Sequence, residues 1–223
     1  MKNLVTCFAV YVLLVSIEKS NHGADTWKKY EFKEGISLSS PVKITRQESD
    51  SGIVYIGTDL SPLPNPRFSV YALAVVPLTK DQKQQKPVIA MRKAIENSWT
   101  HDLNRDLRIL SSEPTAWKNR DSLLTLAKSR FAPLPYTQYH IDRSFIHDGI
   151  RYSLSASQLM QNTNSLAMSE FGLVPSKAEL RQEELRIRRA AERFFKSFTC
   201  KNIEVELKSA TLIASEQNDD GGP

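Results

Sequence analysis

The chain has 223 residues, of which 40% are apolar and 25% charged, with 8 glycines, 11 prolines and 2 cysteines. This composition excludes collagen, a coiled coil, a disulfide scaffold and a wholly disordered chain, and it fits one globular domain of average to large size. The net charge of +5 is a mild imbalance, far from the strongly basic balance of nucleic-acid-binding domains. We therefore expect a globular domain that does not bind nucleic acid.

The first 24 residues have the order of a secretory signal peptide. A basic region at Lys2 precedes a 14-residue segment, Leu4–Ile17, which is apolar at all but two positions. A polar region of mostly small residues follows and ends at Ala24. A helix needs about 20 apolar residues to cross a bilayer, so cleavage after export is favoured over a permanent span. We expect residues 1–24 to be removed, a secreted or periplasmic location, and no transmembrane span in the mature chain.

Cysteine usage excludes an intramolecular disulfide in the mature chain. Cys7 lies in the segment that we expect to be removed, which leaves Cys200 as the only thiol. A nucleophile, a redox sensor and an intermolecular bridge are possible roles for such a thiol. Because Cys200 has no identifiable partner in the sequence, we interpret it as a small buried hydrophobe at the end of a helix. Removal of residues 1–24 leaves 28 basic and 24 acidic residues, a net charge of about +4.

The N-terminal third of the mature chain is typical of strands, because apolar and β-branched residues alternate with polar ones. The predicted strands are Tyr30–Leu38, Val42–Ile44, Ile53–Ile56 and Arg67–Val76. Between them, Gln47–Gly52 is predicted to be a polar turn, and Ser61–Pro66, which contains three prolines, a loop. A polar connection over Lys80–Pro87 follows.

Two helices are predicted. The first spans Val88–Leu107, where apolar residues recur every three or four positions. The second runs from Ser176 to Phe198 and starts with a capping box formed by Ser176 and Glu179. Its apolar face consists of Leu180, Ile187, Ala191, Phe194 and Phe198.

The region between these helices is predicted to be extended beyond Leu110, although Leu124–Phe131 fits either a strand or a short helix. Asp148 and Gly149, between two alternating segments, are the strongest hairpin signal in the chain. Residues 158–176 are expected to be irregular, and the tail at 201–223 largely disordered.

This element order predicts an α+β fold with a mostly antiparallel sheet. The strands occur in groups separated by helices and do not alternate strictly with them, which argues against a doubly wound dinucleotide-binding fold. Neither a GxGxxG nor a GxxxxGK[ST] phosphate loop occurs in the sequence. We therefore expect no nucleotide cofactor.

Three segments carry a family resemblance. Phe32–Pro41 is similar to an opening strand that ends at a proline, Gly149–Ala156 to a late strand that leads into the last helix, and Ala190–Phe198 to a closing helix end with the pattern FF-x-SF. Together they resemble the PsbP-like family, an α/β/α sandwich shared by a photosystem II extrinsic protein, a Ran-GTPase-interacting protein and many bacterial exported proteins. The resemblance implies that residues 25–200 form a central antiparallel sheet between helices. It also implies the non-enzymatic role of most members, and it carries over no active-site residues.

His140, Asp142 and His147 offer an alternative function. On a strand, His140 and Asp142 share a face, whereas His147 and Asp148 lie at the predicted hairpin turn. Zinc needs three or four converging ligands, so we interpret these residues as structural. We therefore expect no catalytic, cofactor-binding or metal-binding residues. An enzyme or a metal-dependent protein that uses His140, Asp142 and His147 is the competing hypothesis.

Other candidate sites are also interpreted as structural. No GxSxG elbow accompanies the scattered serines. Asp102 and Asp106 could pair as carboxylates four residues apart on the first helix, but a solvated helix face explains them better. Trp99 and Trp117 are interpreted as core residues rather than as aromatic platforms on which a ligand could stack.

The last helix carries charges of both signs. Its basic residues are Arg181, Arg186, Arg188, Arg189, Arg193 and Lys196, and its acidic residues are Glu179, Glu183, Glu184 and Glu192. The mixture favours a salt-bridged solvated face, with pairs such as Glu184–Arg188 and Glu192–Lys196, over a docking surface for lipid headgroups, cell-wall polymer or nucleic acid. The resulting hypothesis is an exported, non-enzymatic accessory or binding protein of the bacterial cell envelope. Its partner would be an envelope protein or an anionic surface.

Overall fold

The computed structural model describes residues 26–49, 51–61, 67–100, 105–131, 137–159 and 176–201. In these residues antiparallel strands predominate, and three helices accompany them. The predicted α+β class with a mostly antiparallel sheet is therefore confirmed.

The larger of two sheets has seven strands. They are β3 (Thr45–Ser49), β4 (Gly52–Ser61), β5 (Arg67–Pro77), β6 (Arg105–Trp117), β7 (Arg120–Phe131), β8 (Thr137–His147) and β9 (Ile150–Leu159). Their order across the sheet is β3-β4-β5-β9-β8-β7-β6, and each neighbouring pair is antiparallel. The chain thus crosses from β5 to the far edge at β6 and returns strand by strand to β5.

A second, three-stranded sheet joins the two ends of the described chain. Its strands are β1 (Lys28–Glu31), β2 (Ile36–Ser40) and β10 (Thr199–Cys200), with β2 in the middle. The hydroxyls of Ser37 and Thr199 lie 2.7 Å apart across the β2–β10 pair. The sequence did not predict this separate sheet.

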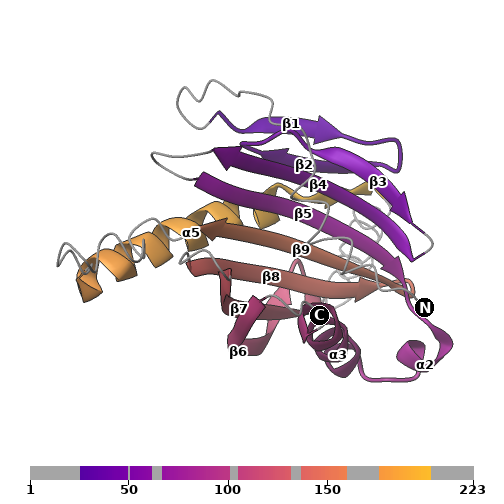
Figure 1. Ribbon diagram of the computed structural model, residues 1–223. Helices are drawn as coiled ribbons and strands as arrows, with labels where there is room; N and C mark the ends of the chain where they lie inside the picture. Colours follow the sequence, from indigo (N-terminus) through magenta and orange to yellow (C-terminus); the bar gives the residue numbers. More distant parts are fainter. Residues whose placement is uncertain are drawn as a thin grey trace, which may run out of the picture.

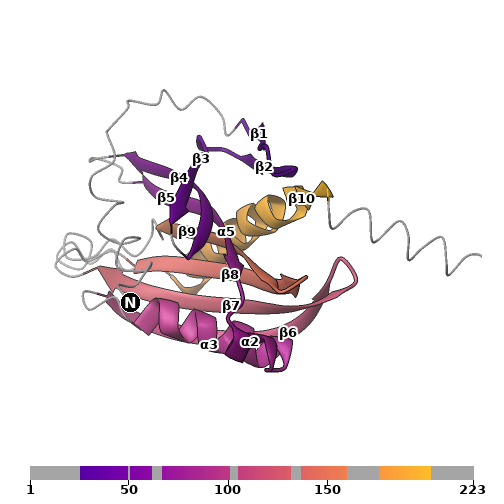
Figure 2. The same ribbon diagram turned by 90° about the vertical axis from the view of Figure 1, so that its right-hand side faces the viewer.

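The helices are α2 (Lys80–Lys83), α3 (Pro87–Thr100) and α5 (Lys177–Ser197). Helix α3 contacts β6, β7 and β8, whereas α5 contacts β2, β8 and β9 (Figures 1 and 2). In β7, Leu126 belongs to the core on the α5 side, and the oppositely directed Leu123 belongs to the core under α3. The larger sheet therefore carries α5 on one face and α3 on the other.

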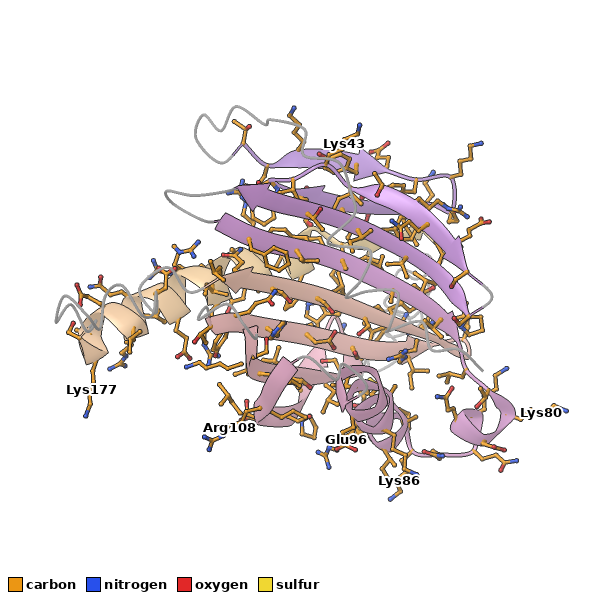
Figure 3. All side chains as sticks on the ribbon, in the orientation of Figure 1. Lys43, Lys80, Lys86, Glu96, Arg108 and Lys177 are labelled. Carbon is orange, nitrogen blue, oxygen red and sulfur yellow. The ribbon has the colours of Figure 1, made fainter. Side chains whose placement is uncertain are left out.

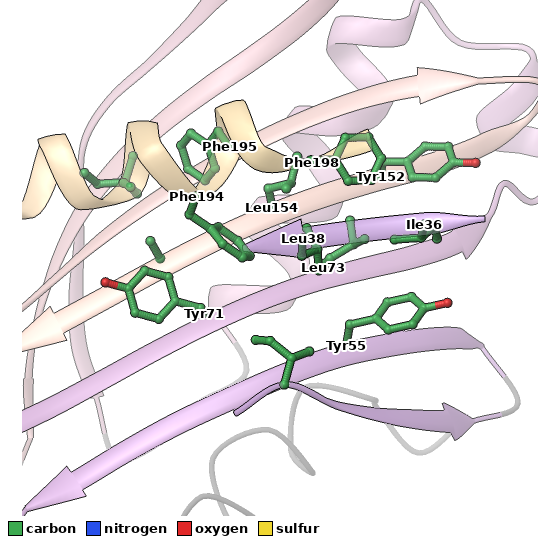
Figure 4. Close-up of a cluster of buried hydrophobic side chains, with 14 of the residues drawn as sticks. Ile36, Leu38, Tyr55, Tyr71, Leu73, Tyr152, Leu154, Phe194, Phe195 and Phe198 are labelled. Carbon is green, nitrogen blue, oxygen red and sulfur yellow. The ribbon is translucent and has the colours of Figure 1, made fainter. Parts of the chain in front are cut away.

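The larger core lies between the seven-stranded sheet, α5 and the small sheet (Figure 4). Phe194, Phe195 and Phe198 at the end of α5 are each at most 2% exposed. The Phe194 ring lies 5.3 Å from that of Tyr71. This closing segment of α5 therefore provides most of the aromatic contact between the helix and the sheet.

Several local predictions are confirmed. Helix α5 starts with the predicted capping box, in which Ser176 Oγ accepts a hydrogen bond from the Glu179 amide at 3.2 Å. Asp148 and Gly149 form the β8–β9 turn with φ values of 49° and 69°, the left-handed region that this kind of hairpin requires. Leu124–Phe131, for which the sequence allowed a strand or a short helix, is part of strand β7.

The predicted first helix is wrong at its C-terminal end. Helix α3 ends at Thr100, and strand β6 already begins at Arg105, so Asp106 and Leu107 lie on a strand. Pairing with β7 begins at Arg105 opposite Phe131. A leucine fits a helical stripe and a strand alternation equally well, and here the non-local pairing decides.

Three shorter predictions are also corrected. Thr45–Ser49 forms β3, which includes Gln47, Glu48 and Ser49, the first half of the segment predicted as a turn. Its residues are all exposed, because a solvated edge strand needs no apolar alternation. Val42 and Ile44 are buried without belonging to a strand. The Lys80–Pro87 connection contains α2, which Thr79 and Gln82 cap.

Some predictions fall outside the described residues. These are the signal peptide at 1–24, the proline loop at 62–66, most of the irregular segment (160–175), and the tail from 202 onward. His101 and Asp102 also fall there, so no helical pair of Asp102 with Asp106 is described. None of the helices in the described ranges is long and apolar enough to cross a membrane.

Candidate functional site on the α3 side of the sheet

Polar side chains gather on the α3-facing side of β8 and β9. Register pairs place Ser144 opposite Ser153, Asp142 opposite Ser155, and His140 opposite Ser157 on this face. Further along β8 on the same face, Ile146 packs against the core under α3. Since every second residue of a strand shares a face, this stretch of β8 and β9 presents a polar cluster in the interior.

Asp142 is the centre of the cluster and is only 2% exposed. Its Oδ1 accepts a hydrogen bond from Ser144 Oγ at 2.7 Å, and its Oδ2 accepts from Ser153 Oγ at 2.7 Å and from Ser155 Oγ at 2.6 Å. Ser144 Oγ and Ser153 Oγ also lie 2.8 Å apart. Both carboxylate oxygens are therefore engaged by neighbours on the same two strands.

The proton balance of this cluster favours a protonated Asp142. Four short contacts connect Asp142 and the three serines, but three hydroxyls carry only three protons. A proton on Oδ1 supplies the fourth: Oδ1 then donates to Ser144 Oγ, Ser144 Oγ donates to Ser153 Oγ, and Ser153 and Ser155 donate to Oδ2. Burial acts in the same direction and raises the pKa of Asp142, while the three hydroxyls and the positive charge of Arg151 act against it.

His140 lies between two hydroxyls and does not contact Asp142 in the manner of a catalytic triad. Its Nε2 is 2.7 Å from Ser129 Oγ, and its Nδ1 is 2.8 Å from Ser157 Oγ. In a triad a carboxylate holds the Nδ1 position, which Ser157 occupies here. Ser129, the residue in the nucleophile position, is itself only 2% exposed.

His147 does not converge with His140 and Asp142. Seven residues separate it from His140 along β8, which corresponds to about 23 Å. Its register partner is Ile150, which packs against the larger core on the α5 side. There Arg120 donates a hydrogen bond to His147 Nδ1 at 2.9 Å.

The three residues of the competing hypothesis therefore occupy opposite faces of the sheet. Within the described residues, no group of three or more His, Cys, Asp or Glu could hold a metal ion. What the Asp142 cluster can do chemically is fix the register of β8 against β9, because a one-residue slip would move the serines to the other face.

The remaining candidate residues pack in the core where they are described. Cys200 is 4% exposed and lies in β10, directly after α5. Trp117 packs against the larger core, with its ring 5.2 Å from that of Phe145. Trp99 lies in α3, but its side chain is outside the described set.

The predicted salt bridges of the last helix are confirmed. Glu184 pairs with Arg188 at 2.8 Å, and Glu192 with Lys196 at 3.9 Å. Arg188 also donates a hydrogen bond to the Tyr139 hydroxyl at 3.0 Å. Sequence reasoning missed that contact, which makes Arg188 more than a solvated charge.

The raised pKa of Asp142 predicts a pH dependence of stability. The folded state holds this proton to a higher pH than the unfolded chain, so the contribution of Asp142 is fully present below its ordinary pKa of about 4 and is lost as pH rises through the raised value. We expect the unfolding free energy of wild type minus that of Asp142→Asn to decrease as pH rises from about 4.

Urea denaturation of both proteins at several pH values measures this difference. Carboxylates with lowered pKa values, such as Glu184 and Glu34, act in the opposite direction but are common to both proteins and cancel. A difference that increases with pH would show that Asp142 is stabilised as the carboxylate.

Comparison with known proteins gives structural likenesses but no sequence family. No family model matches the chain, and no curated protein matches it. Solved structures similar to it include the Saccharomyces cerevisiae Ran-binding protein Mog1p, with a TM-score of 0.47 and 9% identity over 79% of this chain and 96% of that one.

Two bacterial structures are similar as well. The PsbP protein (CyanoP) of Synechocystis sp. PCC 6803 has a TM-score of 0.43 and 8% identity, covering 82% of this chain and 97% of that one. LpqN of Mycobacterium tuberculosis, described as involved in cell envelope biogenesis, has a TM-score of 0.38 and 11% identity, covering 81% and 86%. At these identities and TM-scores, the likenesses carry no argument about the partner or activity of this chain.

Proposed function

We propose that this protein is an exported, non-enzymatic accessory or binding protein of the bacterial cell envelope and a member of the PsbP-like family. One observation carries the proposal: the hydrogen-bonding groups of Asp142 and His140, the strongest catalytic candidates, are already bonded to serines of the same sheet. Asp142 bonds to three serines of its own sheet, and both His140 nitrogens face serine hydroxyls. Such a cluster holds two strands together. A binding function would then use the exterior surface of the domain.

The three segments of the family resemblance support membership through their positions. Phe32–Pro41 contains β2 and ends at the proline after it, and Gly149–Ala156 belongs to the hairpin and β9. Ala190–Phe198 closes α5 with three buried phenylalanines. Each segment thus occupies the kind of element that the resemblance assigns to it.

The export part of this proposal predicts a processed N-terminus. In a bacterial host that expresses the full chain, we expect the periplasmic or secreted fraction to contain protein that begins near residue 25, as read by N-terminal sequencing. A Leu13→Arg variant interrupts the apolar segment and should remain in the cytoplasm with residues 1–24 attached. Wild-type protein retained in the membrane with Met1 in place would contradict export by cleavage.

The non-enzymatic part is tested against the competing metal-dependent function. Calorimetric titration of the mature protein with Zn²⁺ should show no saturable binding. Saturable binding that His140→Ala and Asp142→Asn each abolish, while His101→Ala does not, would favour the competing hypothesis.

A further inference from the structure

The charges of α5 look mixed in the sequence, but the fold separates most of the acidic side chains from an outer side that carries more basic residues. The side chains of Glu183 and Glu184 are only 10% and 31% exposed, and they pair with Arg186 and Arg188. Glu179 is engaged in the capping box at the start of the helix. Three of the four acidic side chains therefore bond within the helix or towards the sheet. The fourth, Glu192, is 64% exposed, lies on the outer side of α5 beside Arg189, and pairs with Lys196 at 3.9 Å.

The opposite side of α5 is cationic. Lys177, Arg181, Arg189 and Arg193 are all exposed. Among the residues that the structure describes, no carboxylate forms an ion pair with any of them. Arg193 instead lies over the Trp27 ring, 4.6 Å from its centroid. These four positive charges thus remain available to a partner.

These cations form one line along the helix. Lys177, Arg181, Leu185, Arg189 and Arg193 follow one another at intervals of four residues, and each interval advances about 40° around the helix axis, so the line is about 24 Å long and winds through about 160°. Its middle part, Arg181, Leu185 and Arg189, stays within about 80° and shares one face. Leu185, at the middle of the line, is 44% exposed. Figure 3 shows Lys177 at the end of α5 that extends past the strands. We call these five residues the α5 stripe.

The shape of the α5 stripe favours an extended anionic surface over a small anion. The face of a helix is convex, so a phosphate ion would meet one arginine at a time, whereas a sheet of headgroups meets Arg181, Leu185 and Arg189 together. Arginine stems can extend along the acyl boundary beside an exposed leucine while their guanidinium groups stay with the headgroups. A leucine between two arginines is suited to a bilayer interface and adds nothing to binding a soluble polyanion.

The position of Trp27 also points to a membrane. Trp27 is held between Tyr71, at a ring distance of 5.7 Å, and Arg193 of the α5 stripe. The described chain therefore begins beside one end of the stripe. Since we expect residues 1–24 to be a signal peptide inserted in the bilayer before cleavage, the precursor would already hold α5 near the membrane.

We propose that the α5 stripe docks the mature protein on an anionic phospholipid surface. This inference rests on the proposed function, because only an exported accessory protein would meet the outer surface of the inner membrane. The docking is peripheral and electrostatic, with Leu185 as the only apolar contact. It should therefore weaken as salt screens the arginines.

The test uses mature protein, residues 25–223, and sedimentation with vesicles of phosphatidylcholine alone or mixed with phosphatidylglycerol. We expect binding only to the mixed vesicles at low ionic strength. Each cation near such a surface contributes about a factor of five in affinity, so Arg181→Ala/Arg189→Ala should weaken binding about 25-fold. The matched control is Arg92→Ala/Arg108→Ala, which removes two exposed arginines from α3 and β6 and should weaken it far less.

Each other outcome overturns the proposal. Equal weakening by the two double variants would mean that net charge, and not the α5 stripe, drives binding. Competition by inorganic phosphate at constant ionic strength would indicate a small-anion site, and tighter binding to polyglutamate than to vesicles would indicate an acidic polymer. Failure of the proposed function would appear separately, as wild-type protein that stays in the cytoplasm.

Discussion

Replacing Phe198 or Phe194 by alanine should lower the free energy of unfolding by about 3–5 kcal/mol, because each change removes a fully buried ring and leaves a cavity. Phe198 lies 5.9 Å from Phe145 and 6.0 Å from both Tyr152 and Trp117, measured between ring centroids. Such a loss is a large part of the roughly 5–15 kcal/mol that stabilises a domain. Guanidinium denaturation of the single variants measures it.

Two arginines of the same helix serve as controls. Arg189→Ala should change stability by less than about 0.5 kcal/mol, as expected for a solvated side chain. Arg188→Ala should cost about 1–2 kcal/mol, since Arg188 bonds to Tyr139 and Glu184. Small and equal effects for all four variants would mean that α5 is peripheral to the fold.

Asp142→Ala should destabilise the protein by a comparable amount, about 3–5 kcal/mol. Three serine hydroxyls lose their acceptor in an interior position, and each unsatisfied buried group costs about 1–3 kcal/mol, partly recovered if the serines bond to one another. The control Asp121→Ala, at an exposed position of β7, should stay within about 0.5 kcal/mol. Thermal and urea unfolding of both variants provide the measurement.

Asp142→Asn separates the two roles of this residue. The amide keeps the shape and one acceptor oxygen, so it should cost clearly less than alanine if hydrogen bonding and space filling dominate. If Asn and Ala were equally damaging, a negative charge at this position would be required, and the inferred proton on Asp142 would be wrong.

The predictions that succeeded depend on short-range physics. The capping box at Ser176, the Asp148–Gly149 turn and the apolar face of α5 each arise from residues within a few positions of one another. Local backbone preferences and helical spacing determine such features before any tertiary contact forms. They are therefore readable from the sequence alone.

The predictions that failed needed partners far along the chain. Leu107 follows a helical stripe in the sequence but is held in a strand by Ser129 of β7. Strand β3 consists of exposed polar residues, and only pairing with β4 makes it a strand. The hydrophobic periodicity and the composition of a segment carry no information about which distant strand it pairs with.

The candidate site was partly predictable for the same reason. Strand periodicity correctly placed His140 and Asp142 on one face, because they are two residues apart. The serines that saturate Asp142 come from β8 and β9, and no motif marks them. Only the register of the hairpin brings Ser153 and Ser155 to the carboxylate. The separation of charge on α5 was likewise hidden, since it depends on which side of the helix meets the sheet.

The small sheet has a consequence for the order of folding. Its middle strand, β2, is completed only when β10 pairs with it, which joins Ile36 to Cys200 near the two ends of the described chain. A chain that passes through a membrane from its N-terminus cannot close this sheet until its last strand has emerged. Contacts between such distant residues form slowly, so β2 would lack one of its two neighbours for most of such a passage.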